Sequence, residues 1–221
     1  ATGNTVVLKP AETTSLTALL FAELCEQAGI PDGVVNIITG DGTTGSLIVN
    51  HKDINKIAFT GSTQVGKLIQ KSLAGRDVGL TLELGGKAAN IVYEDAAIDQ
   101  AVEGVVNGIF FNQGHVCCAG SRLLLQESIH DEFITKLEKR MQTLRVGNPL
   151  DKNTDIGAVN SKEQLNKIEE LVNEGVSDGG KIFQTECELP GNGFWFKPTL
   201  FTDVQPSYSI AREEIFGPVL T

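Results

Sequence analysis

Two adjacent cysteines stand in a loop of small and polar residues, where a thiol could act as a nucleophile. Cys117 and Cys118 lie within the segment 112–121, between a predicted helix and a predicted strand. A thiol in such a loop can attack a carbonyl carbon when its thiolate is stabilised and the loop opens into a cleft. A pair of small buried thiols fits the same residues. His115 is a candidate base for Cys117, but two residues of irregular loop do not fix the direction of its ring.

A carboxylate between two leucines is a candidate general base. Glu83 lies near the end of an apolar strand, in the segment 81–86. We expect this carboxylate to be partly desolvated, which suits it to removing a proton from water or from a substrate. A buried ion pair with a distant lysine or arginine is the alternative interpretation.

Two glycine-rich turns each join a predicted strand to a predicted helix. The segment 40–45 reads Gly-Asp-Gly-Thr-Thr-Gly, but the acidic residue that the dinucleotide fingerprint needs about 20 positions later is missing. The segment 61–66 places Gly61 and Ser62 at a helix start, where backbone N–H groups and a hydroxyl favour an anion. A tight turn in the first case and a plain serine cap in the second are the alternatives.

Strands and helices alternate from the start of the chain, and they must hold these residues in place. Four strands are predicted from apolar and β-branched runs, at 5–8, 34–38, 56–60 and 80–84. The helices predicted between them are one capped by Thr13 or Thr14 and stopped by Gly29, one at 44–50 and one at 62–73. The first strand reads as buried. This alternation predicts an α/β fold with a parallel sheet.

The alternation starts again after Gly85 and Gly86. Further strands are predicted at 90–93, 121–126, 181–184, 194–201 and, where the chain stops, 219–221. Further helices are predicted after a cap at Asp95, at 131–144, and after a capping box at 161–164. Two consecutive glycines after a strand suit a domain joint. We therefore predict two domains, 1–85 and 86–221.

Composition and charge exclude several classes of protein. The net charge is −10, from 18 Lys and Arg against 28 Asp and Glu, which argues against nucleic-acid and anionic-membrane partners. No apolar stretch approaches the roughly 18 residues of a membrane span. Four cysteines are too few for a disulfide framework in a chain of this size, and the adjacency of two of them suits an ordinary metal site poorly. We therefore expect no metal and a cytoplasmic or other reducing compartment. Because the chain starts at Ala1 and stops in a strand-like run, we expect an internal fragment.

Five segments together resemble the aldehyde dehydrogenase superfamily. They occur in the family's order and at about its spacing, at 3–12, 59–63, 82–87, 111–122 and 213–218. The resemblance implies NAD(P)-dependent oxidation of an aldehyde to a carboxylic acid. It also implies that a parallel, Rossmann-like sheet segment in 1–85 is the C-terminal part of the NAD-binding domain. By the same resemblance, 86–221 is the N-terminal part of the α/β catalytic domain that bears the thiol.

The resemblance assigns the chemical roles. Cys117 matches the thiol that forms a thiohemiacetal and then a thioester, and its backbone N–H matches one oxyanion donor. Glu83 matches the residue that activates water to hydrolyse the thioester. The asparagine that supplies the family's second oxyanion donor would precede Ala1, so we expect this chain alone to be inactive. His115 stands where many relatives have glutamine.

The resemblance also implies how the cofactor and other partners bind. Lys9 and Glu12 match the pair that binds the adenosine ribose, and Glu12 favours NAD over NADP because a 2′-phosphate would meet its carboxylate. The other expected cofactor contacts are Gly42 and Gly45 near the adenine, Gly61, Ser62 and Gly66 near the pyrophosphate, and Leu84, Glu214 and Phe216 around the nicotinamide and its ribose. The expected partners are a small-molecule aldehyde and further copies of the full-length chain, as a homodimer or homotetramer.

Three rival functions follow from the same residues. A CoA-acylating relative passes the acyl group to another nucleophile and needs no water activator such as Glu83. An acyl hydrolase would use Cys117 and Glu83 without a nicotinamide. A non-catalytic pseudoenzyme would have no reason to keep Lys9 and Glu214 together with those two residues.

Overall fold

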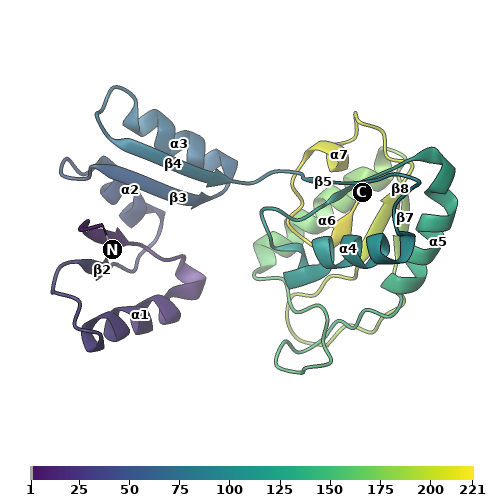
Figure 1. Cartoon of the computed structure of the whole chain (residues 1–221), viewed down its shortest axis with the longest axis horizontal. Coiled ribbons are helices and arrows are strands. Elements are labelled where there is room, and N and C mark those ends of the chain that lie inside the picture. The colour runs from purple at the N-terminus through teal and green to yellow at the C-terminus, as the bar shows by residue number, and fades with distance from the viewer. Residues whose placement is uncertain (1) are drawn as a thin grey trace. The chain divides into compact units, whose positions relative to one another are not determined.

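The computed structural model describes residues 2–221 and shows two compact units, Ala1–Leu84 and Gly85–Thr221 (Figure 1). The division falls beside the pair of consecutive glycines, Gly85 and Gly86. Each unit has buried apolar clusters of its own. The two are described separately below, as unit 1 and unit 2.

Unit 1 alternates short strands and helices. In chain order they are β1 (Val6–Leu8), α1 (Ser15–Gln27), β2 (Val35–Ile37), α2 (Gly42–Asn50), β3 (Lys56–Gly61), α3 (Thr63–Leu73) and β4 (Gly79–Leu84). The strands form parallel pairs, with Val7 opposite Asn36 in β1–β2 and Thr60 opposite Glu83 in β3–β4. The predicted α/β class is confirmed. The single sheet expected from the alternation is divided, because β1 and β2 pair only with each other among the described residues.

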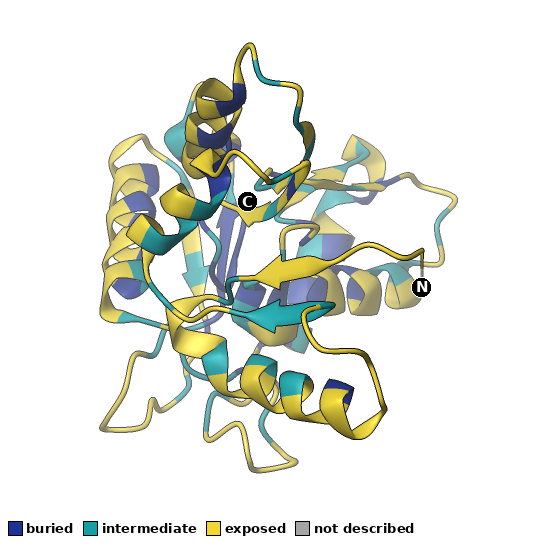
Figure 2. Ribbon diagram, turned by 90° about the vertical axis from the view of Figure 1, so that its left-hand side faces the viewer, coloured by how far each residue is buried: buried dark blue, intermediate teal, exposed yellow. Residues whose placement is uncertain are grey.

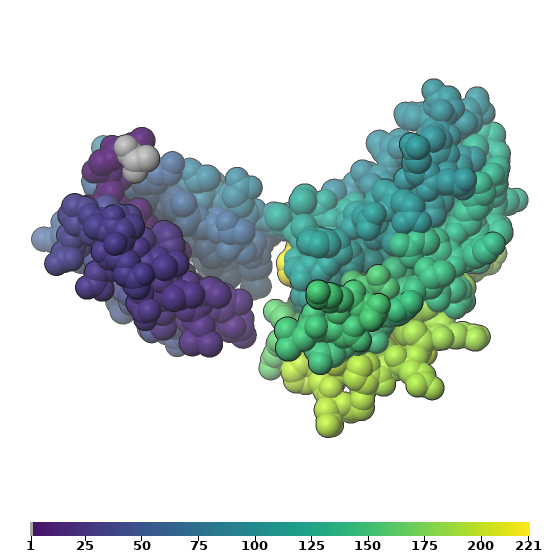
Figure 3. Space-filling view, turned by 60° about the horizontal axis from the view of Figure 1, so that its bottom comes forward, coloured from purple at the N-terminus to yellow at the C-terminus, as the bar shows by residue number. Residues whose placement is uncertain are grey.

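The core of unit 1 lies around α2, α3, β3 and β4, and its buried residues are Val49, Ile57, Ile69 and Leu73. The strand β1 and the helix α1 lie outside this core, since Val6 is 48% and Leu16 82% exposed. The expectation of a buried first strand is therefore wrong here, because β1 pairs with β2 alone and all three of its residues stay exposed. Figure 2 shows the exposure of both elements, and α1 lies on the surface of unit 1 in Figure 3.

Two helices of unit 1 begin at a side-chain cap. The Asp41 carboxylate accepts hydrogen bonds from two backbone N–H groups at the start of α2. The Ser62 hydroxyl accepts one from the first turn of α3. The helix α1 differs from the expectation, because neither Thr13 nor Thr14 caps it with a side chain. A 3₁₀ turn runs directly into its first residue instead.

Unit 2 contains the remaining elements. In chain order they are β5 (Ala89–Val92), α4 (Ile98–Phe110), β6 (Arg122–Leu125), α5 (His130–Met141), α6 (Lys162–Ser177), β7 (Lys181–Gln184), β8 (Thr199–Thr202), α7 (Ser209–Arg212) and β9 (Val219–Leu220). The strands β5 and β6 form a parallel pair. In the second sheet, β8 is antiparallel to β7 and parallel to β9.

Three details of unit 2 differ from the sequence predictions. The helix α4 starts after Ala97 without a side-chain cap, so Asp95 lies in the preceding turn and does not cap it. The strand expected at 194–201 is limited to β8, because Pro198 has no N–H to donate to a ladder. The helix α7 was not expected, since four residues are too few to show a helical period.

Two buried clusters support unit 2. The first joins α4 to α5 through side chains such as Ile109, Phe133 and Leu137. The second joins α6 to β8, β9 and the segment after α7, and it includes Ile168 and Ile215. Because Ile215 is only 2% exposed, the segment around it is anchored in this second cluster.

Candidate active site

Cys117 and Cys118 occupy the two central positions of a tight turn. The turn is closed by a hydrogen bond of 3.0 Å from the Ala119 N–H to the Val116 carbonyl. Both thiols are free and exposed, which contradicts the alternative of two buried thiols, whereas Ala119 is buried in the first cluster. Among residues 2–221, the Cys117 N–H donates to no carbonyl. The turn thus presents a reachable thiol with an unused backbone donor beside it.

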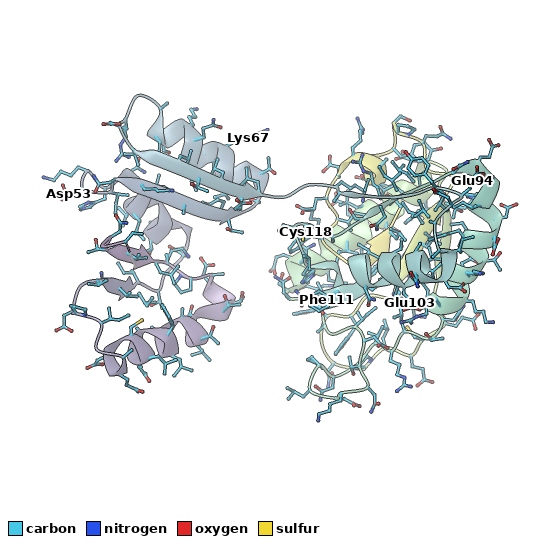
Figure 4. All side chains as sticks on the ribbon, in the orientation of Figure 1. Asp53, Lys67, Glu94, Glu103, Phe111 and Cys118 are labelled. Carbon is cyan, nitrogen blue, oxygen red and sulfur yellow. The ribbon has the colours of Figure 1, made fainter. Side chains whose placement is uncertain are left out.

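The chain that follows the thiol turn is tied to α4 and β5. The Gly120 N–H donates to the Gly108 carbonyl at 3.1 Å, and the Asn90 amide donates to the Gly120 carbonyl at 2.9 Å. A Cβ at Gly120 would displace the Asn90 amide from this position, so glycine leaves room for the bond. Phe111 and Cys118 lie toward the same end of unit 2 (Figure 4). These bonds fix the base from which the thiols project.

The chain that precedes the thiol turn reverses sharply after α4. Asn112, Gln113 and Gly114 all have left-handed φ angles, of 49°, 46° and 75°. The reversal is closed by a bond of 2.9 Å from the His115 N–H to the Asn112 carbonyl. Such angles are uncommon for residues other than glycine. Three in succession therefore mark a specified bend between the buried helix and the thiols.

His115 contacts Phe216 rather than the thiol turn. The two rings are stacked, with centroids 5.2 Å apart and planes 4° from parallel. Burial lowers the pKa of His115, and its Nε2 atom is buried without a hydrogen-bond partner among residues 2–221. The suggestion that His115 is a base for Cys117 gains no support. The stacked rings thus connect the loop that carries the two thiols, residues 112–121 (the thiol loop), to the predicted cofactor residue Phe216.

Glu214 and Phe216 lie in a segment that meets the thiol loop closely. A Cβ at Gly114 would overlap the Gly217 carbonyl, and a Cβ at Gly85 would overlap the Glu214 carboxylate. Both glycines therefore let backbone and carboxylate approach without a side chain between them. One small cavity of unit 2 is lined by both segments, including Val116, Glu214 and Phe216. The structure thus brings these two predicted cofactor residues next to the thiol loop.

Lys87 is a buried charge that the sequence analysis did not select. Its side chain is 9% exposed, and its Nζ atom has no hydrogen-bond partner among residues 2–221. Burial, and secondly the charge of Arg122, lower the pKa of Lys87 to about 8, against a smaller opposing effect of Glu214. The only sequence signal was its place directly after Gly85 and Gly86.

Lys87→Met is expected to stabilise the protein below pH 8. The pKa of Lys87 is about 8 in the folded state against 10.5 unperturbed, so the unfolded state binds the proton first as the pH falls. The free energy of unfolding therefore decreases as the pH falls from 10.5 to 8. Below pH 8 it stays about 3 kcal/mol lower than it would be with an unshifted lysine pKa. Urea unfolding should show a gain for the variant below pH 8 that shrinks toward pH 10.5. A variant less stable than wild type below pH 8 contradicts this account.

Lys9 and Glu12 meet at the start of α2 in unit 1. The Lys9 ammonium donates to the Gly40 carbonyl at 2.9 Å and lies 3.5 Å from the Glu12 carboxylate. A bond from its own backbone N–H, followed by the charge of Lys9, lowers the pKa of Glu12. A Cβ at Gly45 would touch the Lys9 side chain, whereas one at Gly42 would meet open space. Lys9 thus lies beside both Glu12 and Gly45, and the contact of these residues with a cofactor stays a prediction.

The second glycine turn packs α3 against β4. Ser62 caps α3 by accepting from the Val65 N–H at 3.3 Å. A Cβ at Gly66 would come within 2.6 Å of the Leu84 side chain. Gly61 is similarly close to the ring of Phe59. Helix capping and close packing thus account for Ser62, Gly61 and Gly66 without a ligand. Their contact with a cofactor stays a prediction.

Glu83 is exposed, which contradicts the expected desolvation. Along β4 the exposed residues alternate with half-buried ones, and Thr81 and Glu83 share the exposed face. Leu82 and Leu84 point the other way because successive side chains of a strand alternate between its two faces. Two flanking leucines in sequence therefore do not enclose the carboxylate. Glu83 belongs to unit 1, whereas Cys117 belongs to unit 2.

Residues 2–221 contain neither a metal-binding cluster nor a membrane-spanning helix. No group of three or more His, Cys, Asp or Glu side chains is arranged to hold a metal ion there. In the same part of the chain, no helix has the length and apolar character that crossing a membrane requires.

Comparison with known proteins agrees with the fold class. The model of the aldehyde dehydrogenase family matches residues 1–221. Retinal dehydrogenase 2 of Homo sapiens is 50% identical over 223 residues, which cover 98% of this chain and 42% of that protein. Cytosolic 10-formyltetrahydrofolate dehydrogenase of Xenopus laevis is 48% identical over 220 residues, covering 99% of this chain and 24% of that protein.

Solved structures give the same result. The NAD-dependent aldehyde dehydrogenase of Sinorhizobium meliloti has a TM-score of 0.94 and 42% identity, over 98% of this chain and 43% of that one. The NAD+ complex of an aldehyde dehydrogenase from Bacillus cereus has a TM-score of 0.93 and 42% identity, over 98% and 44%.

The fold and the site define an α/β protein with an exposed thiol in a fixed turn. The chain belongs to the aldehyde dehydrogenase family. It spans 24% of the length of the Xenopus laevis relative and 42% of the length of the Homo sapiens relative.

Proposed function

We propose that the protein carrying this chain oxidises an aldehyde to a carboxylic acid, with NAD as the hydride acceptor. The observation that carries the proposal is the exposed Cys117 thiol, in a turn fixed by main-chain bonds and with an unused N–H beside it. Family membership and the NAD+ complex of a Bacillus cereus relative support the same chemistry. In this proposal unit 1 is part of the NAD-binding domain and unit 2 part of the catalytic domain.

Cys117 is the nucleophile. Its thiolate forms a C–S bond to the aldehyde carbon, and the oxygen takes up negative charge that the Cys117 N–H can stabilise. Departure of a hydride from this carbon leaves a thioester on Cys117. Bound NAD supplies the acceptor for that hydride. The exposure of the thiol gives an aldehyde direct access to it.

Glu83 is the general base of the second half-reaction. It takes a proton from water, whose oxygen attacks the thioester carbon and displaces the Cys117 thiolate. In total, one aldehyde and one water yield a carboxylic acid, a hydride and a proton. The exposed position of Glu83 on β4 lets water reach the carboxylate. A water activator favours hydrolysis over transfer of the acyl group to CoA.

Several residues of the chain are proposed to hold NAD. Lys9 and Glu12, which are already joined at the start of α2, fit the two hydroxyls of the adenosine ribose. Glu214 fits the nicotinamide ribose and Phe216 the nicotinamide ring, with the Leu84 backbone toward the carboxamide. The remaining proposed contacts are Gly42, Gly45, Gly61, Ser62 and Gly66. The open space at Gly42 fits this assignment, because a ligand can approach the bare backbone there.

Glu12→Ser is expected to weaken the preference for NAD over NADP. The lowered pKa of Glu12 keeps its carboxylate ionised at neutral pH, where it accepts from ribose hydroxyls and repels a 2′-phosphate. Such a mismatch costs about 1–3 kcal/mol, so the ratio of kcat/KM for the two cofactors should fall about 5- to 150-fold. Steady-state kinetics of wild type and variant measure it, with Glu26→Ser on α1 as a control. Equal use of both cofactors by wild type contradicts the role of Glu12.

The proposed activity is tested with a panel of aldehydes on a protein that contains this chain and the rest of the family fold. NADH absorbance and the carboxylic acid should appear in equal amounts. Product that requires added CoA would show acyl transfer instead. Acid formed without NADH would show an acyl hydrolase. Absence of both products from every aldehyde would support the pseudoenzyme.

Exposed apolar side chains and free thiols bear on assembly and compartment. We propose a homodimer or homotetramer, supported by exposed apolar side chains in unit 1 such as Leu16 and Leu68, which are 82% and 59% exposed. We propose a cytoplasmic or other reducing compartment, supported by four free cysteines and by relatives named as cytosolic. Analytical ultracentrifugation tests the first proposal and fractionation of cells the second.

A further inference from the structure

We propose that Asn90 is a positioning residue for the acylation of Cys117, because its side chain holds the chain on which the thiol turn rests. Asn90 lies on β5, and its amide reaches the carbonyl of Gly120, three residues after Cys117. The inference rests on the proposed function in one respect, since it takes Cys117 as the nucleophile. It concerns the transfer of the acyl group to sulfur and not the binding of NAD.

Both polar groups of the Gly120 backbone are held by other elements. Its N–H donates to the Gly108 carbonyl on α4 at 3.1 Å, and its carbonyl accepts from the Asn90 amide at 2.9 Å. Among residues 2–221 no other donor reaches this carbonyl. Because Gly120 is buried, bulk water does not replace a lost partner. The Asn90 amide is therefore what keeps this peptide group in its observed direction.

The Asn90 side chain fits between two glycines. A Cβ at Gly120 would displace the amide, and a Cβ at Gly108 would lie 3.7 Å from the amide nitrogen, at ordinary contact distance. On β5, Asn90 shares the inward face with Val92, which is buried in the first cluster. Inward positions of a parallel strand are normally filled by apolar side chains. The bond to Gly120 accounts for an amide at such a position.

The thiol turn is the part of the chain that can respond to loss of this bond. It ends directly before Gly120. On the other side of Gly120 the chain is fixed, because the Ser121 carbonyl accepts from the Thr221 N–H at 3.0 Å. Without the Asn90 amide, the buried carbonyl must rotate toward another donor. The turn has to absorb that rotation, and the Cys117 N–H changes direction with it.

Loss of the bond should slow reactions that need the Cys117 N–H more than reactions that need only the thiolate. Attack on a carbonyl group places negative charge on its oxygen, which this N–H stabilises. Attack on iodoacetamide forms a C–S bond at a methylene carbon and releases iodide, so no charge develops on a carbonyl oxygen. The two reactions together separate the placement of the donor from the reactivity of the thiol.

The test compares Asn90→Ala and Gly120→Ala with a control, Gln184→Ala, in a protein that contains the rest of the family fold. Gln184 on β7 donates its amide to the Thr199 hydroxyl at 3.0 Å, so the control also removes one amide donor from unit 2. Acylation is measured with p-nitrophenyl acetate in the absence of NAD. In this reaction the Cys117 thiolate takes the acetyl group, and p-nitrophenolate leaves.

We expect both test variants to be acylated about 10- to 100-fold more slowly, because a displacement of about 1 Å near a reacting group has effects of this size. Alkylation by iodoacetamide should stay within about threefold of wild type, and Kd for NAD within about twofold. A loss of stability alone would not change acylation and alkylation by different factors. The control should match wild type in all three measurements.

The double variant of Asn90→Ala and Gly120→Ala gives the sharpest comparison. The three atoms nearest to a Cβ at Gly120 all belong to Asn90, so the methyl group meets none of them once Asn90 is alanine. The double variant should therefore be acylated as fast as either single variant, within about twofold. Independent effects would multiply to about 100- to 10⁴-fold, and that result would overturn the proposal.

Hydrogen exchange of the cofactor-free protein reports on the same contact without a reaction. Amides of 116–121 should exchange faster in both test variants and be unchanged in the control. Unchanged acylation and exchange in both test variants would overturn the proposal, and so would equal losses of acylation and alkylation. If wild type is acylated but reduces no NAD with any aldehyde, the proposed function fails, and the acylation rates still decide the role of Asn90. If Asn90→Ala does not fold, Gly120→Ala decides by the same criteria.

Discussion

Cys117→Ala should abolish aldehyde oxidation in a protein that contains this chain and the rest of the family fold, while Cys118→Ala keeps most of it. The two thiols occupy consecutive central positions of one turn, so their side chains leave it in different directions. Only one can reach a carbonyl carbon whose oxygen lies near the Cys117 N–H. Without the nucleophile no thioester can form, and NADH production should fall by roughly 10³-fold or more.

The two cysteine variants control for each other, because both residues are exposed and both substitutions remove one thiol. Thermal unfolding of the two should be similar. Mass spectrometry of wild type after a quenched reaction should place the acyl group on the peptide of Cys117. Equal loss of activity in both variants, or activity kept in Cys117→Ala, contradicts the assignment of the nucleophile.

Glu83→Gln should stop turnover after the first chemical step. An amide cannot take the proton of the attacking water, so the thioester accumulates once hydride has been transferred. Stopped-flow measurement should show a burst of NADH equal to the enzyme concentration. The steady rate that follows should be about 10²- to 10⁴-fold slower than in wild type. Because Glu83 is exposed, its substitution should change the free energy of unfolding by no more than about 0.5 kcal/mol.

A carboxylate elsewhere on unit 1 serves as control for this burst. Glu23→Gln on α1 removes the same charge from an exposed position and should turn over like wild type. Loss of the burst itself in Glu83→Gln would show that Glu83 acts before hydride transfer. A normal steady rate would show that another group activates the water.

Much of the fold follows from neighbours in sequence. The strands β3 and β4, the helix α3 and the start of α6 lie within a few residues of their predicted positions, because apolar period and capping depend on residues up to four positions apart. Ser62 caps α3 for the same local reason. The start of α4 was predicted less well, because the helix begins after Ala97 with no side-chain cap and Asp95 is left in the preceding turn.

In the candidate site, too, some features follow from the local sequence and others depend on the tertiary structure. The amino-acid sequence by itself determined the kinds of residue available: a thiol in a small-residue loop, a carboxylate on a strand, and glycines at two helix starts. Only the tertiary structure decided that Glu83 is exposed and that the buried Lys87 ammonium finds no hydrogen-bond partner within residues 2–221. It alone also decided that the Gln164 amide donates to the carbonyls of Ile215 and Phe216. Burial and hydrogen-bond partners depend on which distant segments fold against a residue. That information is absent from any short stretch of sequence, however clear its period.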